Sequence, residues 1–214
     1  MSYDNTIAVL TGDLVGSVAL GPEKVEQAMT ALEDAARGME HWVGAPLRFT
    51  RHRGDGWQVV VETPKFAIRV ALMFRAALRS LGSEFDTYVG LAEGPSHPIE
   101  ETDLNKVTGD VFTKSGASLE EAKASGPSLR MDYHFPFSKN SVLILADHIS
   151  QGWTPVQAQL LQVLLAPSDK LTPVTQLAEM FGKSRQTISK SVEAAGFEAI
   201  YMALFSLEWE PKND

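Results

Sequence analysis

Residues 7–17, IAVLTGDLVGS, are the stretch around which the predicted fold is organised. Its apolar, β-branched start predicts a buried strand, and the glycines on either side of Asp13 indicate a turn. A helical pattern begins at Pro22, so we expect Asp13 at the carboxyl end of a strand that leads into a helix. A carboxylate beside free backbone N–H groups suits a cation, a phosphate or both.

A second carboxylate lies in residues 53–57, RGDGW, between β-like runs at 47–52 and 57–62. A Gly-Asp-Gly centre between two such runs predicts a tight hairpin. Asp55 is then either a turn-forming aspartate or a ligand. The neighbouring Arg51, His52 and Arg53 either pair with phosphates or neutralise the carboxylates.

Strand and helix patterns continue as far as residue 146. Together they predict an α+β domain of ferredoxin-like type, with helices on one face of a mostly antiparallel sheet. We predict strands at 6–10, 47–52, 57–62, 86–92 and 141–146, and helices at 22–39, 64–81 and 111–124.

Beyond residue 147 only helical patterns remain, which predicts two domains, 1–147 and an all-helical 148–214. Within the second, residues 176–190, QLAEMFGKSRQTISK, have the layout of a helix-turn-helix. Ala178 permits close helix approach, Gly182 allows a left-handed turn, and Ile188 points into the core. The second helix then exposes side chains suited to base edges and phosphates: Ser184, Arg185, Gln186, Ser189 and Lys190.

This tail segment resembles the winged-helix and sigma-factor-like helix-turn-helix families. The alternative is an ordinary helical hairpin with a solvated polar face. If it binds DNA, one copy should bind modestly and in a salt-sensitive way, so we expect a dimer on paired half-sites.

The composition limits the class of protein. A chain of 214 residues with 44% hydrophobic and 21% charged residues has enough apolar surface for a core. The absence of cysteine excludes disulfides, cysteine-ligated zinc and a cysteine nucleophile. No stretch resembles a signal peptide or spanning helix, so we expect a cytoplasmic protein without a membrane partner. The net charge of −8 argues against nonspecific coating of nucleic acid, but not against a local DNA-reading patch.

Together, GDLVGS at 12–17, GDGW at 54–57 and the element order resemble the catalytic domain of class III nucleotidyl cyclases. The resemblance implies that Asp13 and Asp55 hold divalent cations, Mg²⁺ or Mn²⁺, against a nucleoside triphosphate. It also implies that a turn cradles the phosphates, with nucleotide-binding residues Leu14, Val15, Gly16 and Ser17. Because cyclase sites form between two subunits, it further implies a homodimer. With the helix-turn-helix added, the chain is similar to the SatD family of small bacterial proteins.

The chain departs from the cyclase pattern in two places. Arg51 stands where the family has a base-selecting lysine, which leaves the purine preference open. Residues 109–119, GDVFTKSGASL, lack the asparagine and arginine that the family places on this helix. Lys114 supplies a charge there but no bidentate fork, and Lys114 and Arg51 are the cations that we expect at the nucleotide. Efficient catalysis is therefore not expected.

These features favour a one-component regulatory protein, in which a degenerate cyclase-like domain senses a nucleotide-type ligand or only dimerises and the tail binds DNA. The alternative is a metal-dependent nucleotidyl cyclase or transferase with a regulatory tail. A third possibility is an interaction protein in which both modules are relics.

Overall fold

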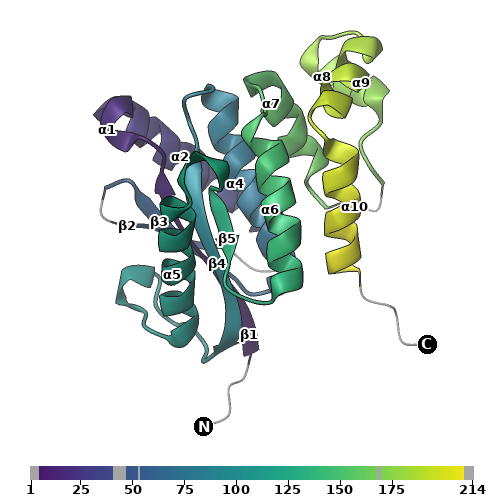
Figure 1. The fold of residues 1–214 in the computed structure, drawn as a ribbon. Coiled ribbons are helices and arrows are strands. Elements are labelled where there is room, and N and C mark those ends of the chain that lie inside the picture. Colours follow the sequence, from purple (N-terminus) through teal and green to yellow (C-terminus); the bar gives the residue numbers. More distant parts are fainter. Residues whose placement is uncertain (1–4, 41–46, 53, 168–169, 210–214) are drawn as a thin grey trace, which may run out of the picture.

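The computed structural model describes residues 5–40, 47–52, 54–167 and 170–209. A five-stranded sheet lies between helices, and a helical tail stands beside them (Figure 1). The elements, in chain order, are β1 (Asn5–Leu14), α1 (Ser17–Leu20), α2 (Pro22–Gly38), β2 (Arg48–His52), β3 (Gly56–Val61), the 3-10 helix η1 (Pro64–Phe66), α4 (Ala67–Leu81), β4 (Thr87–Ser96), η2 (Leu104–Lys106), α5 (Asp110–Ala124), η3 (Gly126–Ser128), β5 (Met131–Tyr133), α6 (Phe137–Gln151), α7 (Pro155–Leu164), α8 (Val174–Phe181), α9 (Arg185–Ala194) and α10 (Phe197–Glu208).

The strand order is β2-β3-β1-β4-β5, which places β1 at the centre of the sheet. β1 runs antiparallel to β3 and β4, β2 is antiparallel to β3, and β4 and β5 are parallel. The first four strands with α2 and α4 form a β-α-β-β-α-β unit of ferredoxin-like type. The predicted α+β class and the mostly antiparallel sheet are confirmed.

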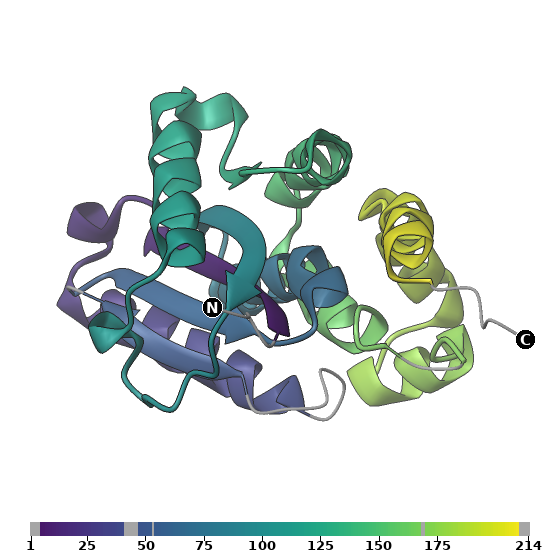
Figure 2. The ribbon, with the colours of Figure 1, turned by 90° about the horizontal axis from the view of Figure 1, so that it is seen from below.

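Successive residues of β1 point to opposite faces of the sheet, and those on both faces are apolar. Both faces of the sheet are therefore buried. Ala8 and Leu10 pack in the core that contains α2 and α4, whereas Ile7 and Val9 pack with α5. Figure 2 shows α5 and α2 on opposite sides of the sheet. The helices therefore cover both faces, rather than the single face expected from the sequence.

The predicted strand at 141–146 is wrong: these residues belong to α6, and the last strand is the three-residue β5. The buried residues Leu143, Ala146, Asp147 and Ser150 follow helical spacing. A short apolar run such as VLIL does not distinguish a buried strand from a buried helix. The predicted boundary between residues 147 and 148 consequently falls inside α6.

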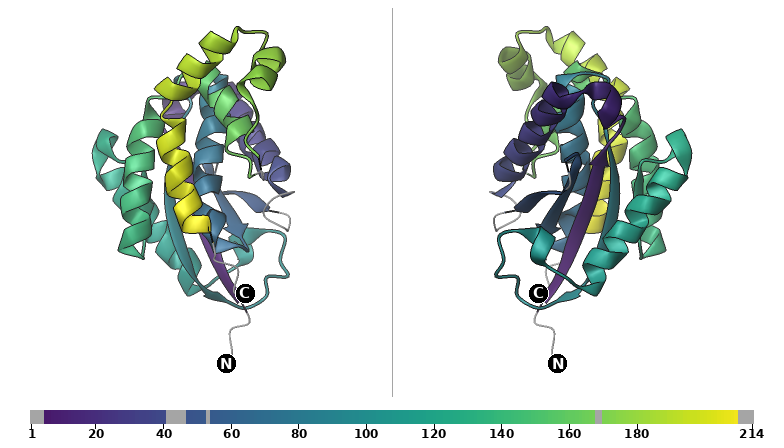
Figure 3. Two further views of the ribbon diagram at one scale, coloured as in Figure 1. Left: turned by 90° about the vertical axis from the view of Figure 1, so that its right-hand side faces the viewer. Right: turned by 90° about the vertical axis from the view of Figure 1, so that its left-hand side faces the viewer.

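The tail packs directly on the sheet domain. Leu160 and Leu161 of α7 belong to the same hydrophobic core as the sheet. Helix α10 contacts α6 and η1, and in the left view of Figure 3 it lies on the side that faces the viewer. The Arg69 guanidinium of α4 pairs with the Glu208 carboxylate of α10 at 2.6 Å and donates to the Leu165 carbonyl at 2.7 Å. The core is therefore continuous from the sheet into the tail.

Candidate functional site

The structure brings Asp13 and Asp55 together at one end of the sheet. Asp13 of β1 is the register partner of Gly56 of β3, so Asp55, in the β2–β3 turn, is one residue away. The Leu14 amide donates to the Asp55 carbonyl at 3.2 Å. Both aspartates are partly buried. The two predicted metal ligands thus share one place in the fold.

Trp57 and Thr87 fix the strand end that carries Asp13. The Trp57 indole occupies the space over Gly12, where an added Cβ would lie 2.1 Å from the ring. The indole N–H donates to the Thr87 hydroxyl at 3.0 Å, and this hydroxyl lies 2.9 Å from the Asp13 carbonyl oxygen. Gly12 is therefore needed for this packing, independently of any ligand.

Lys123, near the end of α5, forms an ion pair with Asp13 that the sequence did not predict. Its Nζ lies 2.7 Å from Asp13 Oδ2 and 3.4 Å from Glu120 Oε1. Burial lowers the pKa of Lys123, but the hydrogen bonds and negative charges of Asp13 and Glu120 together outweigh burial, so the net pKa is raised. Lys123 therefore stays protonated and neutralises Asp13. The sequence indicates this contact only through the expected direction of α5, whose last turn must lie at the end of the sheet that carries Asp13.

Lys114, predicted as a nucleotide ligand, is not brought to the aspartates. Its Nζ pairs with Asp110 of the same helix at 2.6 Å. It precedes Lys123 by nine residues, which is roughly 13 Å along a helix axis. Of these two α5 lysines, Lys123 supplies the cation at the aspartate pair.

Arg51, the other predicted nucleotide-binding cation, is held by α2. It lies 2.7 Å from the Glu26 carboxylate and donates from Nε to the Gly54 carbonyl at 2.6 Å. The hydrogen bond to Glu26 raises the pKa of Arg51. His52 is bonded to Asn105. Arg53 lies outside the described residues.

The turn at residues 14–17 is partly closed to a ligand. The Leu14 amide is bonded to Asp55, and the Val15 amide donates to the Asp86 carbonyl at 2.9 Å. Gly16 has a φ of 65°, in the left-handed region, and Ser17 begins α1. Contrary to the expected open cradle, a phosphate at Leu14 or Val15 must first displace a backbone carbonyl.

The residues at the sheet end fit a cation held jointly with a phosphate. Within the described residues, no group of three or more histidine, aspartate or glutamate side chains is arranged to hold a metal ion. Mg²⁺ is commonly bound by one or two carboxylates together with substrate phosphates and water. Asp13 and Asp55 match that donor set once the ion pair between Lys123 and Asp13 is broken.

In the tail, α8 and α9 are joined by a turn at the predicted position. Gly182 ends α8 with a φ of 60°, Ser184 accepts from the Thr187 amide at 3.1 Å, and Ile188 is buried. The five predicted DNA-binding side chains are all exposed: Ser184, Arg185, Gln186, Ser189 and Lys190.

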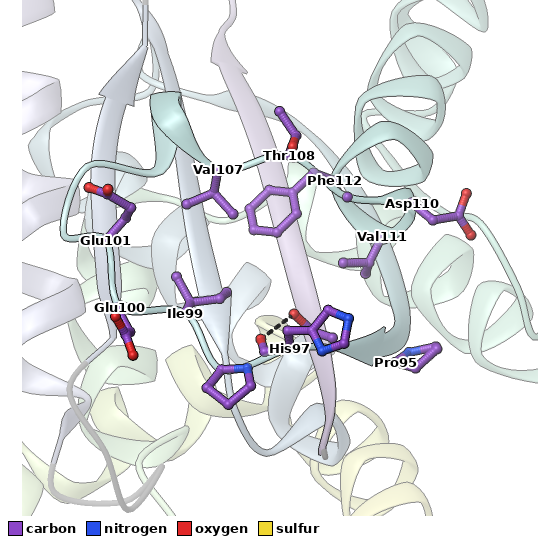
Figure 4. A pocket seen from close by; sticks show the side chains of 13 residues that line it. Pro95, His97, Ile99, Glu100, Glu101, Val107, Thr108, Asp110, Val111 and Phe112 are labelled. Atoms are coloured by element: carbon purple, nitrogen blue, oxygen red, sulfur yellow. Dashed lines mark hydrogen bonds between the residues drawn. The ribbon is translucent and has the colours of Figure 1, made fainter. Parts of the chain in front are cut away.

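A cavity of about 360 Å³ lies at the other end of β4 and α5 (Figure 4). Ile99, Val107 and Phe112 form its apolar part, and acidic side chains such as Glu100 and Asp110 lie at its edge. None of the predicted site residues lines this cavity. It is separate from the aspartate pair.

No family model and no curated protein matches this chain. Among solved structures, it is similar to the active GGEEF domain of a diguanylate cyclase from Vibrio cholerae, at 13% sequence identity and a TM-score of 0.46, over 62% of this chain and 85% of that one. It is also similar to the guanylyl cyclase Cya2, at 18% identity and a TM-score of 0.42, over 56% of this chain and 73% of that one.

Membership of the SatD family stays a prediction. As to membranes, none of the helices in the part of the chain that the structure describes combines the length and apolar character needed to span a bilayer.

Proposed function

We propose that this protein is a one-component regulator that binds DNA through α8 and α9 and binds a nucleotide-type ligand at the aspartate pair. The observation that carries the proposal is the exposed row on α9. Arg185 and Lys190 face solvent on a helix whose opposite side is anchored by buried Ile188. A fixed helix with exposed cations and hydrogen-bonding side chains suits insertion into a major groove.

The ligand proposal rests on the charges at the sheet end. Two carboxylates suit a divalent cation, and Lys123 suits a phosphate oxygen once the cation replaces it at Asp13. A nucleoside triphosphate with Mg²⁺ or Mn²⁺ supplies both charges in one molecule. Ligand binding would thus exchange the Asp13–Lys123 pair for two pairs with the ligand.

The residues of this site suit the binding of a nucleotide-type ligand better than its rapid catalytic conversion. Residues 110–124 of α5 contain neither arginine nor asparagine. A transition-state arginine is worth roughly 10³- to 10⁵-fold in phosphoryl transfer. A lysine supplies a point charge without the bidentate fork.

Two copies would act together on DNA. A single helix-turn-helix makes few phosphate contacts, and dimers of such modules bind half-sites about one helical turn apart. We therefore propose a homodimer that acts in the cytoplasm.

The DNA-binding proposal is tested by retardation of genomic fragments in a gel. Arg185→Ala with Lys190→Ala should abolish the retardation seen with the wild type. The matched control is Arg37→Ala with Lys106→Ala, which removes two exposed charges on α2 and η2 and should leave it intact. If wild type and the α9 variant bind DNA equally poorly, the regulator proposal fails.

The second candidate is a metal-dependent nucleotidyl cyclase or transferase, favoured by two aspartates at one end of the sheet and a lysine paired with Asp13. Incubation with Mn²⁺ and each nucleoside triphosphate should then give a cyclic or linear product. Both Asp13→Asn and Asp55→Asn should lose that product. An unchanged product in either variant would place the chemistry elsewhere.

A further inference from the structure

A cluster of charged side chains, buried except for the partly exposed Arg130, connects the turn after Asp13 to the tail. It lies between α4, α6 and the starts of β4 and β5. Its members are Arg75, Arg79, Asp86, Arg130 and Asp147.

Arg75 is the bridge within this cluster. It is fully buried, and its Nε donates to Asp86 Oδ1 at 3.0 Å. Its Nη1 donates to Asp147 Oδ1 at 2.5 Å and to the Ser150 hydroxyl at 2.6 Å. One guanidinium thus joins the residue before β4 to two residues of α6.

One end of the cluster contacts the turn after Asp13, and the other contacts the end of α6, which leads to α9. On one side, the Asp86 carbonyl accepts the Val15 amide of the candidate phosphate turn. On the other, Arg79 donates to the Gln151 carbonyl at 2.7 Å, at the last residue of α6. Just beyond α6, the buried Trp153 indole donates to the Ala195 carbonyl at 2.9 Å, at the end of α9. The proposed ligand turn and the proposed DNA-reading helix are therefore joined through hydrogen-bonded groups.

The cluster is not fully satisfied in this arrangement. Three arginines face two aspartates, and within the described residues Arg75 Nη2, Arg79 Nε and Arg130 Nε are buried without a hydrogen-bond partner. A buried donor without a partner costs roughly 1–3 kcal/mol. Unsatisfied groups of this kind in a folded core call for an explanation, and a second arrangement that uses these donors is one.

We propose that this cluster relays ligand binding at the Asp13 turn to the DNA-reading helix, with Arg75 as the positioning residue. A phosphate that takes the Val15 amide releases the Asp86 carbonyl, and the Asp86 carboxylate then shifts against the three arginines. Arg75 transmits this shift to Asp147 and Ser150, and so to the end of α6 and to Trp153. The inference rests on the proposed nucleotide-type ligand and adds how its binding reaches the tail.

Two tryptophan indoles provide separate reporters for the two ends. The Trp57 indole is bonded to Thr87, beside Asp13, and the Trp153 indole is bonded to Ala195, at the end of α9. Their N–H resonances in ¹⁵N–¹H spectra of the full chain are assigned with Trp57→Phe and Trp153→Phe. Titration with ATP and with GTP, each with Mg²⁺, should shift both resonances with the same midpoint.

The relay is then removed with Arg75→Met plus Asp147→Asn, which keeps the net charge and keeps a side-chain oxygen to accept the Arg130 amide. In this variant Trp57 should still shift, whereas the Trp153 shift should be lost. The matched control is Arg69→Met plus Glu208→Gln, which removes the other buried pair between α4 and the tail. Both resonances should still shift in the control.

The outcomes separate the two proposals. If neither resonance shifts in the wild type with either nucleotide, the nucleotide-ligand proposal fails and the relay with it. If Trp57 shifts and Trp153 does not, only the relay is overturned. A Trp153 shift that survives in the Arg75 variant, or that is also lost in the Arg69 control, overturns the assignment of the relay to Arg75. Thermal melts of both variants verify that they are folded.

Discussion

Lys123 Nζ lies 2.7 Å from Asp13 Oδ2, so the candidate metal ligand already carries a cation of the protein's own. This pairing makes cation binding at Asp13 competitive with Lys123. The Lys123 ammonium also places a positive charge where a ligand phosphate would lie.

Replacing Lys123 should therefore have opposite effects on metal and nucleotide. In Lys123→Met, Mn²⁺ alone should bind more tightly, because Asp13 is no longer neutralised. ATP or GTP should bind about tenfold more weakly, since a charge-assisted hydrogen bond is worth about 1.5–3 kcal/mol. Isothermal titration calorimetry measures both. Lys114→Met, on the same helix but paired with Asp110, should change neither affinity, and equal effects of the two variants would contradict the assignment.

The close packing of α5 on the sheet predicts a contrast between two glycines. A Cβ at Gly90 would lie 2.1 Å from the Leu119 amide nitrogen, so Gly90→Ala should destabilise the protein by about 3 kcal/mol or more. Gly116 lies within α5 with no atom near its added Cβ, so Gly116→Ala should stabilise by about 0.5–1 kcal/mol. Urea denaturation measures both. Similar effects of the two substitutions would contradict the packing of α5 against Gly90.

The buried cluster predicts a loss of stability in acid. Burial raises the pKa of Asp86, but Arg75, Arg79 and Arg130 outweigh it, so the net pKa is below the ordinary 3.8. Because the folded-state pKa is the lower one, the stabilisation is fully present above about pH 4 and is lost as the pH falls through the folded value.

Asp86→Asn should therefore cost about 3–5 kcal/mol at neutral pH, since it leaves buried arginines without their carboxylate. The deficit should shrink as the pH falls below 4. Unfolding free energies of both proteins across this range provide the measurement. A deficit that does not change with pH would show that Asp86 is not the titrating group.

Much of the fold follows from local patterns. The glycine-aspartate turn, the hairpin and the turn between α8 and α9 were predictable because each depends on residues close in sequence, such as Gly182 with φ 60° and the Ser184 cap. Residues 141–146 of α6 were mistaken for a strand because their apolar run is ambiguous, and because the buried Asp147 that follows pairs with Arg75, far away in sequence.

The candidate site likewise combines features that the sequence indicated with contacts that depend on the three-dimensional packing. The pairing of Asp13 with Asp55 was expected only from the resemblance to the cyclase catalytic domain, because the register of β1 with β3 that brings them together is a long-range contact. Lys123 could not be predicted, because its contact depends on how closely α5 lies against Gly90 and where that helix ends. The occupied amides of Leu14 and Val15 likewise depend on Asp55 and Asp86, which no local pattern connects with the turn.

The central claim, that ligand binding at the aspartate pair changes DNA binding by the tail, is tested most directly by DNA affinity measured with and without Mg²⁺-ATP or Mg²⁺-GTP. Fluorescence anisotropy of a labelled genomic fragment retarded by the wild type serves as the readout. We predict that one nucleotide changes the dissociation constant about 5- to 150-fold, the usual range of coupling, and that Asp13→Asn with Asp55→Asn removes the change while retaining DNA binding. An affinity that is the same with and without either nucleotide would contradict the account.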